Sequence, residues 1–203
     1  YDADTCRTYK NNLLKDKPNY CSICKDVKEL DILSLPVVDG FLYGFPCNDF
    51  SIVGEKKGLN GKYGPLYKCG VAVLEHSKPK WFIAENVSGI TNANQKVAFK
   101  KIVSDMKKAG PGYKLVIHEY KFEAYGVPQA RHRMIIVGIR SDLAETGVIF
   151  RVPAPSGKIL TAGQALAGIP KSAKNQQLTR QSPVVVERLK HIKPGENVWN
   201  AKL

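Results

Sequence analysis

The chain has 203 residues, enough for one α/β domain with a substantial core or for most of one plus an appendage. No apolar run reaches the ~18 residues of a membrane span and no leader opens the sequence, so we expect a soluble protein, cytoplasmic in a prokaryote and nuclear in a eukaryote. The formal net charge of +13 indicates a polyanionic partner such as nucleic acid, although a basic, solvated surface would give the same value.

The five cysteines indicate reduced thiols in a cytosolic setting, because their number is odd and no leader precedes them. Cys21 and Cys24 have the spacing of half a zinc site. A tetrahedral zinc ion needs two more ligands, and only Cys6, Cys69 and scattered histidines remain. We therefore expect no metal.

A helical pattern is predicted from the first residues to Pro18, and Asp2 is expected either to face solvent or to cap this helix. The segment Asn19–Lys25 is a weak candidate for a strand that ends at Asp26 and Val27. An acid at the end of a strand can accept a hydrogen bond from the exocyclic amine of a bound aromatic ring, while the next residue packs on that ring. An acid in an ordinary turn would have the same sequence.

The most informative stretch is an apolar run, Leu35–Tyr43, followed by a loop, Gly44–Ser51. The run is short, aromatic and β-branched, which predicts a buried strand, and the loop follows its carboxyl end, where open α/β sheets bind ligands. Cys47 follows Pro46 in that loop and is placed to act as a nucleophile. A buried structural thiol is the alternative that this segment alone leaves open.

The middle of the chain alternates helices and strands, which predicts a sheet flanked by helices. One helix is expected to start at Gly64-Pro65-Leu66-Tyr67, with the proline in its first turn, and to run to about Lys78-Pro79. A second helix, Asn94–Lys108, is expected to bury its apolar residues, which are Val97, Ile102, Val103 and Met106. The predicted strands are Trp81–Val87, Tyr113–Phe122 and Met134–Ile139.

Three short motifs occur in order along the chain: Pro46-Cys47, Glu85-Asn86-Val87 and Gln129-Ala130-Arg131-His132-Arg133. Together they resemble the ordered motifs of the cytosine-C5 DNA methyltransferases, of prokaryotic or phage restriction-modification type. Any one motif alone would be weak, whereas the ordered set is specific and the resemblance covers nearly the whole chain. It implies a Rossmann-like α/β methyltransferase sheet, incomplete at the N-terminus. It also implies a partial catalytic domain over residues 1–149 and the start of a target-recognition region over residues 150–203.

The resemblance implies that Cys47 adds to C6 of a cytosine flipped out of DNA, so that C5 can accept a methyl group from S-adenosylmethionine. The attacking species is a thiolate, which requires cationic surroundings that Arg131 and Arg133 can supply. Charge that develops on the ring is met by Glu85 near N3 and by Arg133 at O2. Arg131 is assigned to the active-site wall or to a phosphate. Without the resemblance, the two arginines would fit a surface salt-bridge face.

The resemblance also implies contacts to the cofactor and to the nucleic acid. The residues assigned to S-adenosylmethionine are Tyr1, Asp26, Val27, Pro46 and Leu66. Those assigned to double-stranded DNA are Asn48, Ser51 and Gln129, and Asn48 stands where the family usually has glutamine. The segment from Arg151 to Leu203 carries nine lysine and arginine residues against two acids, which fits phosphate contacts or an ordinary exposed face.

The family's Gly-rich first motif and its closing motifs are not found in the sequence. We therefore expect a piece of a longer protein or a chain that works with a complementing chain, and we expect the isolated 203 residues not to methylate. Two alternatives stay open: an enzyme of the same family that acts on transfer RNA, and a catalytically silent DNA-binding or regulatory subunit. No membrane partner is expected.

Overall fold

The structure, a computed structural model, describes residues 2–17, 19–46, 66–91, 96–170, 172–174, 176–177 and 179–199. The chain divides into two compact units, residues 1–161 and 162–203. Among the helices of the described ranges, none combines the length and the hydropathy that crossing a bilayer requires.

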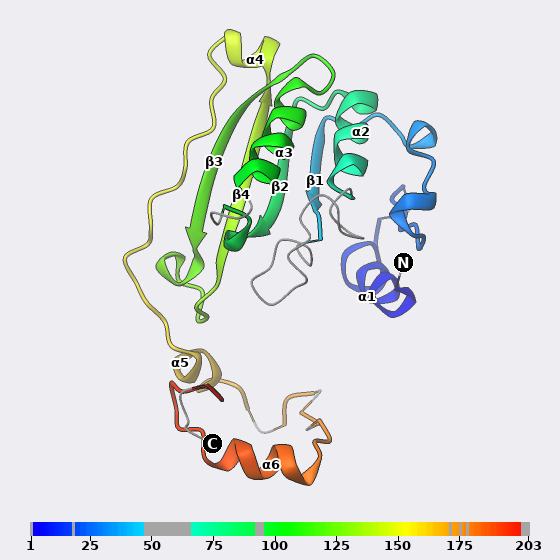
Figure 1. The fold of residues 1–203 in the computed structure, drawn as a ribbon. Helices are drawn as coiled ribbons and strands as arrows, with labels where there is room; N and C mark the ends of the chain where they lie inside the picture. Colours follow the sequence, from blue (N-terminus) through cyan, green and yellow to red (C-terminus); the bar gives the residue numbers. More distant parts are fainter. Residues whose placement is uncertain are drawn as a thin grey trace. The chain divides into compact units, whose positions relative to one another are not determined.

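A mixed sheet of four strands forms the centre of the first unit (Figure 1). Its strands are β1 (Gly40–Gly44), β2 (Trp81–Val87), β3 (Tyr113–Lys121) and β4 (His132–Arg140), in the spatial order β1-β2-β4-β3. β1 pairs in parallel with β2, whereas β4 runs antiparallel to both β2 and β3. The carboxyl ends of β1 and β2 therefore lie at the same end of the sheet as the beginning of β4.

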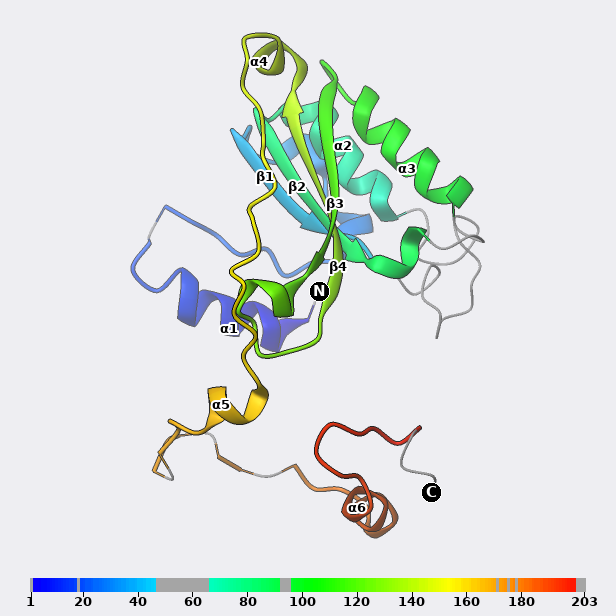
Figure 2. The same ribbon diagram turned by 90° about the vertical axis from the view of Figure 1, so that its left-hand side faces the viewer.

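Two helices, α2 (Tyr67–Ser77) and α3 (Lys96–Lys108), cover one face of this sheet (Figure 2). Each helix buries residues four positions apart, which places them on one side of the helix. Full burial of a large aliphatic side chain contributes about 1.5–3 kcal/mol, so this layer is a main source of stability. The buried residues of the layer include Gly70 and Leu74 of α2, Ala98, Ile102 and Met106 of α3, and Phe82, Ala84 and Ile136 of the strands.

The start of the chain confirms one prediction and corrects another. Helix α1 (Ala3–Leu13) is capped by Asp2, whose carboxylate accepts a hydrogen bond from the Thr5 N–H at 2.6 Å. The predicted strand Asn19–Lys25 is wrong, because this segment has no regular secondary structure. It leads instead into a short 3-10 helix, η1 (Val27–Glu29), which the Asp26 side chain caps. A carboxylate that bonds to the backbone two residues on favours such a turn over an extended strand.

Two predictions of burial are wrong. The run Leu35–Tyr43 is not a buried strand along its length, because the strand begins at Gly40 and Leu42 is 65% exposed. β1 is the outermost strand of the described sheet and the two helices cover one face, so alternate side chains of β1 stay exposed. In α3, Val97 is 82% exposed. It lies about 100° around the helix from the buried stripe that begins at Ala98.

The first unit extends beyond β4 through α4 (Ser141–Glu145) and the segment that follows it. The Ser156 N–H donates to the Ala124 carbonyl at 2.9 Å, and the Tyr125 hydroxyl donates to the Pro153 carbonyl at 3.0 Å. These bonds tie the segment up to Ser156 to the first unit, which runs to Thr161. The predicted boundary between a catalytic domain and a target-recognition region after residue 149 stays a prediction. The second unit contains α5 (Ala162–Leu166) and α6 (Pro183–Lys190), and its role in target recognition stays a prediction.

Candidate active site

An acid and an arginine meet at the end of the sheet where β2 finishes and β4 begins. Arg133 pairs with Val87 in the antiparallel register, two residues from Glu85, so the two charged side chains lie on the same face of the sheet. The Nε of Arg133 lies 2.8 Å from Oε1 of Glu85. The Nη1 of Arg133 also donates to the carbonyl of His132 at 2.7 Å, which fixes the plane of the guanidinium. The structure therefore brings together two of the predicted catalytic residues.

Both members of this pair remain accessible to a ligand. The Glu85 side chain is 41% exposed and that of Arg133 is 22% exposed. A carboxyl group and a guanidinium held side by side present complementary hydrogen-bonding groups, the first to ring nitrogens and amines and the second to a carbonyl oxygen. Such a pair can bind the polar edge of a pyrimidine.

The backbone of β1 leaves the sheet directly beside Glu85. Gly44 is the parallel partner of Glu85, and a Cβ atom built on Gly44 would lie 3.4 Å from Oε2 of that carboxylate. The chain then continues through Phe45 and Pro46 to Cys47. Cys47 lies outside the described residues, as do the predicted DNA contacts Asn48 and Ser51. The structure therefore describes the backbone up to Pro46, the residue before the proposed nucleophile.

The Asn86 side chain holds the backbone of Phe45, which precedes Pro46, and the sequence motif assigned no role to this residue. Its side chain is 3% exposed, and its Nδ2 donates to the Phe45 carbonyl at 3.1 Å. Its Oδ1 accepts from the Val87 N–H at 2.8 Å. A buried amide must satisfy both its donor and its acceptor, and here the donor holds the residue that precedes Pro46. Asn86 is therefore a positioning residue for the loop that carries Cys47.

Glu123 lies on the other side of the candidate site, and no sequence motif pointed to it. Its Oε1 lies 2.7 Å from Nε2 of His132, and its Oε2 accepts from the Arg131 N–H at 3.2 Å. A hydrogen bond from its own backbone N–H, and then the contact with His132, lower the pKa of Glu123. The Phe122 N–H adds a bond to the Arg131 carbonyl at 3.0 Å. Together these contacts anchor the two residues that precede Arg133.

The two remaining predicted residues of this motif have exposed side chains. Arg131 is exposed and precedes β4, and among the described residues its guanidinium forms no ion pair. Gln129 is also exposed, and its backbone N–H donates to the Val127 carbonyl at 2.8 Å. Both side chains are available to a partner at the surface.

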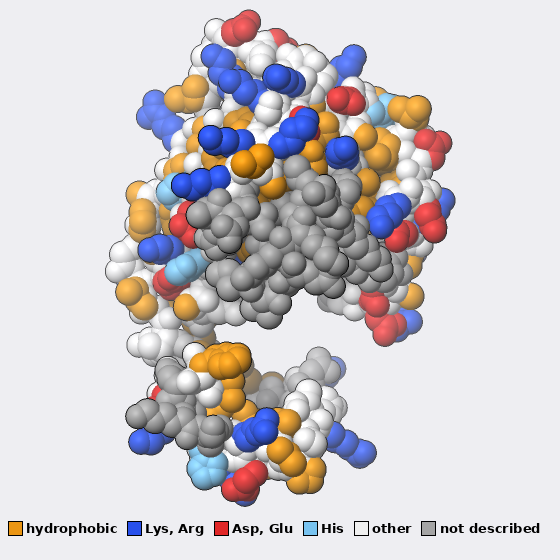
Figure 3. Space-filling model, viewed as in Figure 1, with side chains coloured by type: hydrophobic (Ala, Val, Ile, Leu, Met, Phe, Trp, Pro, Cys, Tyr) orange, Lys and Arg blue, Asp and Glu red, His pale blue; other side chains and the backbone are white. Residues whose placement is uncertain are grey.

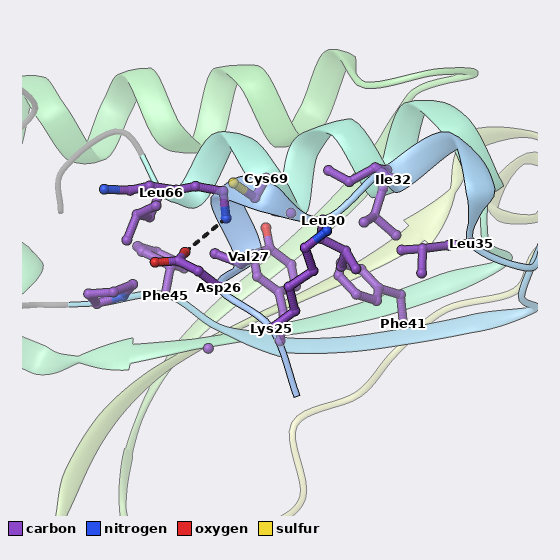
Figure 4. A pocket seen from close by; sticks show the side chains of 16 residues that line it. Lys25, Asp26, Val27, Leu30, Ile32, Leu35, Phe41, Phe45, Leu66 and Cys69 are labelled. Carbon is purple, nitrogen blue, oxygen red and sulfur yellow. Dashed lines mark hydrogen bonds between the residues drawn. The ribbon is translucent and has the colours of Figure 1, made fainter. Parts of the chain in front are cut away.

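A cavity of about 780 Å³ lies between β1, the first half of α2 and the segment around η1 (Figure 4). This volume is within the usual range for small-molecule sites, roughly 300–1,000 Å³. Four of the five residues predicted to bind the cofactor line it, namely Asp26, Val27, Pro46 and Leu66. The fifth, Tyr1, lies outside the described residues.

The walls of the cavity combine apolar surface with a few polar groups. Oδ1 of Asp26 accepts from the Lys28 N–H at 2.9 Å, which fixes the carboxylate at the wall (Figure 4). Burial raises the pKa of the Cys69 thiol, which keeps it neutral. The apolar part is made by Leu30, Ile32, Leu35, Phe41, Phe45 and Val73. Apolar walls with an acid among them suit an adenosyl group, so the residues present fit S-adenosylmethionine.

Comparison with solved structures defines the fold. A putative DNA modification methyltransferase from an Escherichia coli prophage superposes with a TM-score of 0.64 over 84% of this chain and 47% of its own, at 23% identity. A mutant of DNMT2 from Spodoptera frugiperda superposes with a TM-score of 0.59 over 95% of this chain and 56% of its own, at 17% identity. The sheet and its helices therefore have the Rossmann-like methyltransferase fold that the sequence predicted.

Sequence comparison identifies the family. The profile of the C-5 cytosine-specific DNA methylases matches residues 1–202. The type II methyltransferase M.BbvI of Brevibacillus brevis is 52% identical over 209 residues, which cover 100% of this chain and 55% of the relative. M.NgoFVII of Neisseria gonorrhoeae is 39% identical over 81% of this chain and 45% of its own length. The chain belongs to the C-5 cytosine-specific DNA methylases, and it spans about half the length of these curated relatives.

Proposed function

We propose that the protein carrying this chain transfers a methyl group from S-adenosylmethionine to C5 of a cytosine in double-stranded DNA. The observation that carries the proposal is the Glu85–Arg133 pair, held at 2.8 Å beside the strand that leads to Pro46 and Cys47. An acid, a guanidinium and a nucleophile are the groups that the activation of a pyrimidine requires.

In the proposed reaction, the thiolate of Cys47 forms a bond to C6 of the cytosine, and the electron pair of the C5–C6 double bond moves to C5. C5 would then take the methyl group from the sulfonium of the cofactor, whose methyl–sulfur bond breaks and leaves a neutral thioether. Transfer of the C5 proton to water re-forms the C5–C6 double bond as the S–C6 bond breaks with its electron pair returning to sulfur, which restores the aromatic ring and the free thiolate. Glu85 donates a hydrogen bond at N3 and accepts one from the N4 amine, while Arg133 binds O2.

The cavity beside β1 is the proposed cofactor site. Asp26 and Val27 would hold the adenine, the acid through the exocyclic amine and the aliphatic side chain by packing on the ring. Pro46 and Leu66 would cover the adenosyl group from the loop and from the start of α2. The family membership supports the identity of the cofactor, and the lining residues support its place.

Charge supports a nucleic acid as the partner. Lysine and arginine side chains gather over α3 and the strands beside it (Figure 3). The sequence of α3 carries five lysines and one acid, Asp105, which pairs with Lys101 at 2.5 Å. Such surfaces attract a phosphate backbone. The proposed DNA contacts are Asn48, Ser51 and Gln129, with Arg131 on a phosphate or the wall of the site.

DNA is favoured over transfer RNA because the matching relatives are named type II methyltransferases and the family is described as acting on DNA. A catalytically silent subunit remains the alternative to an enzyme, since an exposed acid beside a guanidinium also occurs as an ordinary surface ion pair, and covalent trapping by Cys47 distinguishes the two. A second chain that completes the enzyme stays part of the proposal.

Covalent trapping tests this proposal in the natural full-length protein. Duplex DNA of randomised sequence that carries 5-fluorocytosine is incubated with S-adenosylmethionine, because fluorine at C5 cannot leave as a proton does. The wild type is expected to form a complex that survives denaturing electrophoresis, and Cys47→Ala is expected to form none. The exposed Cys21→Ala serves as the matched control and should trap like the wild type. Trapping by Cys47→Ala, or no trapping by the wild type, would refute the mechanism.

A further inference from the structure

Tyr120 of β3 belongs to no motif of the sequence, and it lies directly opposite Arg133 of β4 in the antiparallel register. Residues opposite one another in such a ladder share a face of the sheet, with their Cβ atoms about 4.5–5.5 Å apart. On the other side of β4, Glu85 of β2 lies on the same face, and its carboxylate contacts the Arg133 guanidinium. The Arg133 side chain therefore stands between an aromatic residue on one flank and an acid on the other.

The ring of Tyr120 is held in place by other aromatic rings. Tyr120 is 8% exposed, and Phe122 stacks on its ring at a centroid distance of 5.8 Å. The His118 ring meets it edge-on at 4.7 Å, and the Tyr125 ring lies 5.3 Å away. The Tyr125 hydroxyl donates to the Pro153 carbonyl at 3.0 Å, which anchors this second tyrosine. The position of the Tyr120 ring is therefore fixed by packing.

A fixed ring at this position limits where the Arg133 side chain can lie. An arginine side chain has many rotamers, and an ion pair near the surface contributes little by itself, because holding both side chains in one geometry costs entropy. The Tyr120 ring fills space on the β3 side of Arg133, so it excludes conformers that would carry the guanidinium across β3. The conformers that remain lie toward β2, where Nε reaches Oε1 of Glu85 at 2.8 Å.

We propose that Tyr120 is a positioning residue for Arg133, whose guanidinium its ring keeps on the β2 side of the site, facing Glu85 and the base. The inference rests on the proposed function, and it adds to that function a residue that the three sequence motifs do not contain. The ring acts by occupying space. Phenylalanine at position 120 should therefore serve as well as tyrosine, whereas a smaller and more flexible aliphatic side chain should not.

The test measures single-turnover methylation of duplex DNA of randomised sequence by the natural full-length protein at saturating cofactor. Tyr120→Leu is expected to slow methyl transfer by about 10- to 100-fold, because a guanidinium displaced by about 1 Å loses that much of its effect. Tyr120→Phe is expected to react at close to the wild-type rate. Calorimetry should show an unchanged affinity of Tyr120→Leu for S-adenosylmethionine, since Tyr120 does not line the cofactor cavity.

Phe99→Leu is the matched control, because it exchanges a partly buried ring on α3, away from Arg133, for the same aliphatic side chain. That variant is expected to melt at a lower temperature and to methylate DNA at the wild-type rate under conditions in which it is folded.

A double-mutant cycle separates positioning from simple support of the fold. Arg133→Gln removes the guanidinium, so adding Tyr120→Leu to that variant should cause no further loss of rate. A ring that only stabilises the sheet would instead slow methyl transfer by the same factor with and without the guanidinium.

A further readout does not depend on activity. The Arg133 Nε–H signal, assigned by nuclear magnetic resonance as the one lost in Arg133→Gln, should exchange its hydrogen more slowly in the wild type than in Tyr120→Leu. The reason is that an N–H held against a carboxylate is protected from exchange with water.

The possible failures can be told apart. Wild-type turnover of Tyr120→Leu, or an equal loss of rate in both backgrounds, would overturn the inference and leave the proposed function intact. A Tyr120→Phe rate as low as that of Tyr120→Leu would assign the effect to the hydroxyl and would also overturn it. Absence of methyl transfer by the wild type would refute the proposed function, and unchanged exchange of the Arg133 Nε–H in Tyr120→Leu would separately refute the positioning role.

Discussion

The guanidinium of Arg133 and the carboxylate of Glu85 face one another across two antiparallel strands, with Nε 2.8 Å from Oε1. The contact exists because β4 runs opposite to β2, which brings the first residues of one strand to the last residues of the other. Each group orients its neighbour before a base arrives, and orientation before the reaction is what makes such groups effective.

Glu85→Gln is expected to slow methyl transfer by about 10²–10⁴-fold, because the amide keeps the shape of the side chain and cannot supply a proton at N3. Single-turnover methylation of duplex DNA by the full-length protein measures this rate. The matched control is Glu119→Gln, an exposed acid on β3 that pairs in register with Met134 and therefore lies on the other face of the sheet from Arg133. A Glu85→Gln variant with near-normal turnover would remove Glu85 from the mechanism.

Asn86→Ala is expected to lower the free energy of unfolding by about 1–3 kcal/mol, because it leaves the buried Phe45 carbonyl without its donor. Methyl transfer should slow as well, since the backbone before Pro46 is no longer held. Urea unfolding and single-turnover rates measure the two effects. Asn12→Ala, at an exposed site on α1, should change neither. Normal turnover with reduced stability would make Asn86 structural only.

Glu123 gives a pH-dependent prediction, because its contacts with its own N–H and with His132 lower its pKa in the folded state. A carboxyl whose pKa falls on folding stabilises the protein above its unfolded pKa, and this stabilisation is lost as the pH falls through the folded pKa. Glu123→Gln is therefore expected to be less stable than the wild type at pH 7, and the difference should shrink as the pH falls below the ordinary glutamate pKa of about 4.3 and vanish below the lowered folded pKa.

The same variant should slow methyl transfer by up to about 10²-fold, since the residues before Arg133 lose their anchor. Unfolding in urea at several pH values and single-turnover rates provide the measurements. Glu145→Gln, an exposed acid on α4, is the control. A stability difference that persists unchanged at pH 3 would contradict the role given to the Glu123 carboxylate.

A strand could be predicted where one short stretch of sequence contains both its apolar residues and the turn residues that bound it. Trp81–Val87 and the strand from Tyr113 follow from short apolar runs with turn residues at both ends, and both are confirmed. β4 begins at His132 instead of the predicted Met134, because pairing with Lys121 draws the preceding residues into the sheet. The extent of β1 could not be predicted either, since its burial depends on which elements cover it.

Some residues of the candidate site could likewise be predicted from the sequence, and others could not. The motifs nominated Glu85 and Arg133, but their contact depends on the order of the strands, which no single segment encodes. Asn86 and Glu123 were missed as candidate residues because each bonds to a partner distant in the sequence or across a turn: Asn86 to the Phe45 carbonyl and Glu123 to the Arg131 N–H. A buried amide or hydroxyl acquires a role only when the groups around it are known.

The packing of Tyr43 against Gly70 gives the last prediction, which concerns the coupling of the two residues. A Cβ atom at Gly70 would lie 2.2 Å from the Tyr43 ring, so Gly70→Ala is expected to lower the free energy of unfolding by about 1–3 kcal/mol. This effect exceeds the gain of up to about 1 kcal/mol that alanine normally brings to a helix interior.

In a Tyr43→Ala background the collision is absent, and Gly70→Ala should then be neutral or stabilising. In a Tyr43→Phe background the ring remains, and Gly70→Ala should cost as much as in the wild type. Urea unfolding of the single and double variants measures the coupling, expected at about 1–3 kcal/mol. Gly168→Ala, which has open space around it, should change stability by no more than about 0.5 kcal/mol. Additive effects of Gly70→Ala and Tyr43→Ala would mean that the ring is free to move and that Gly70 does not set its position.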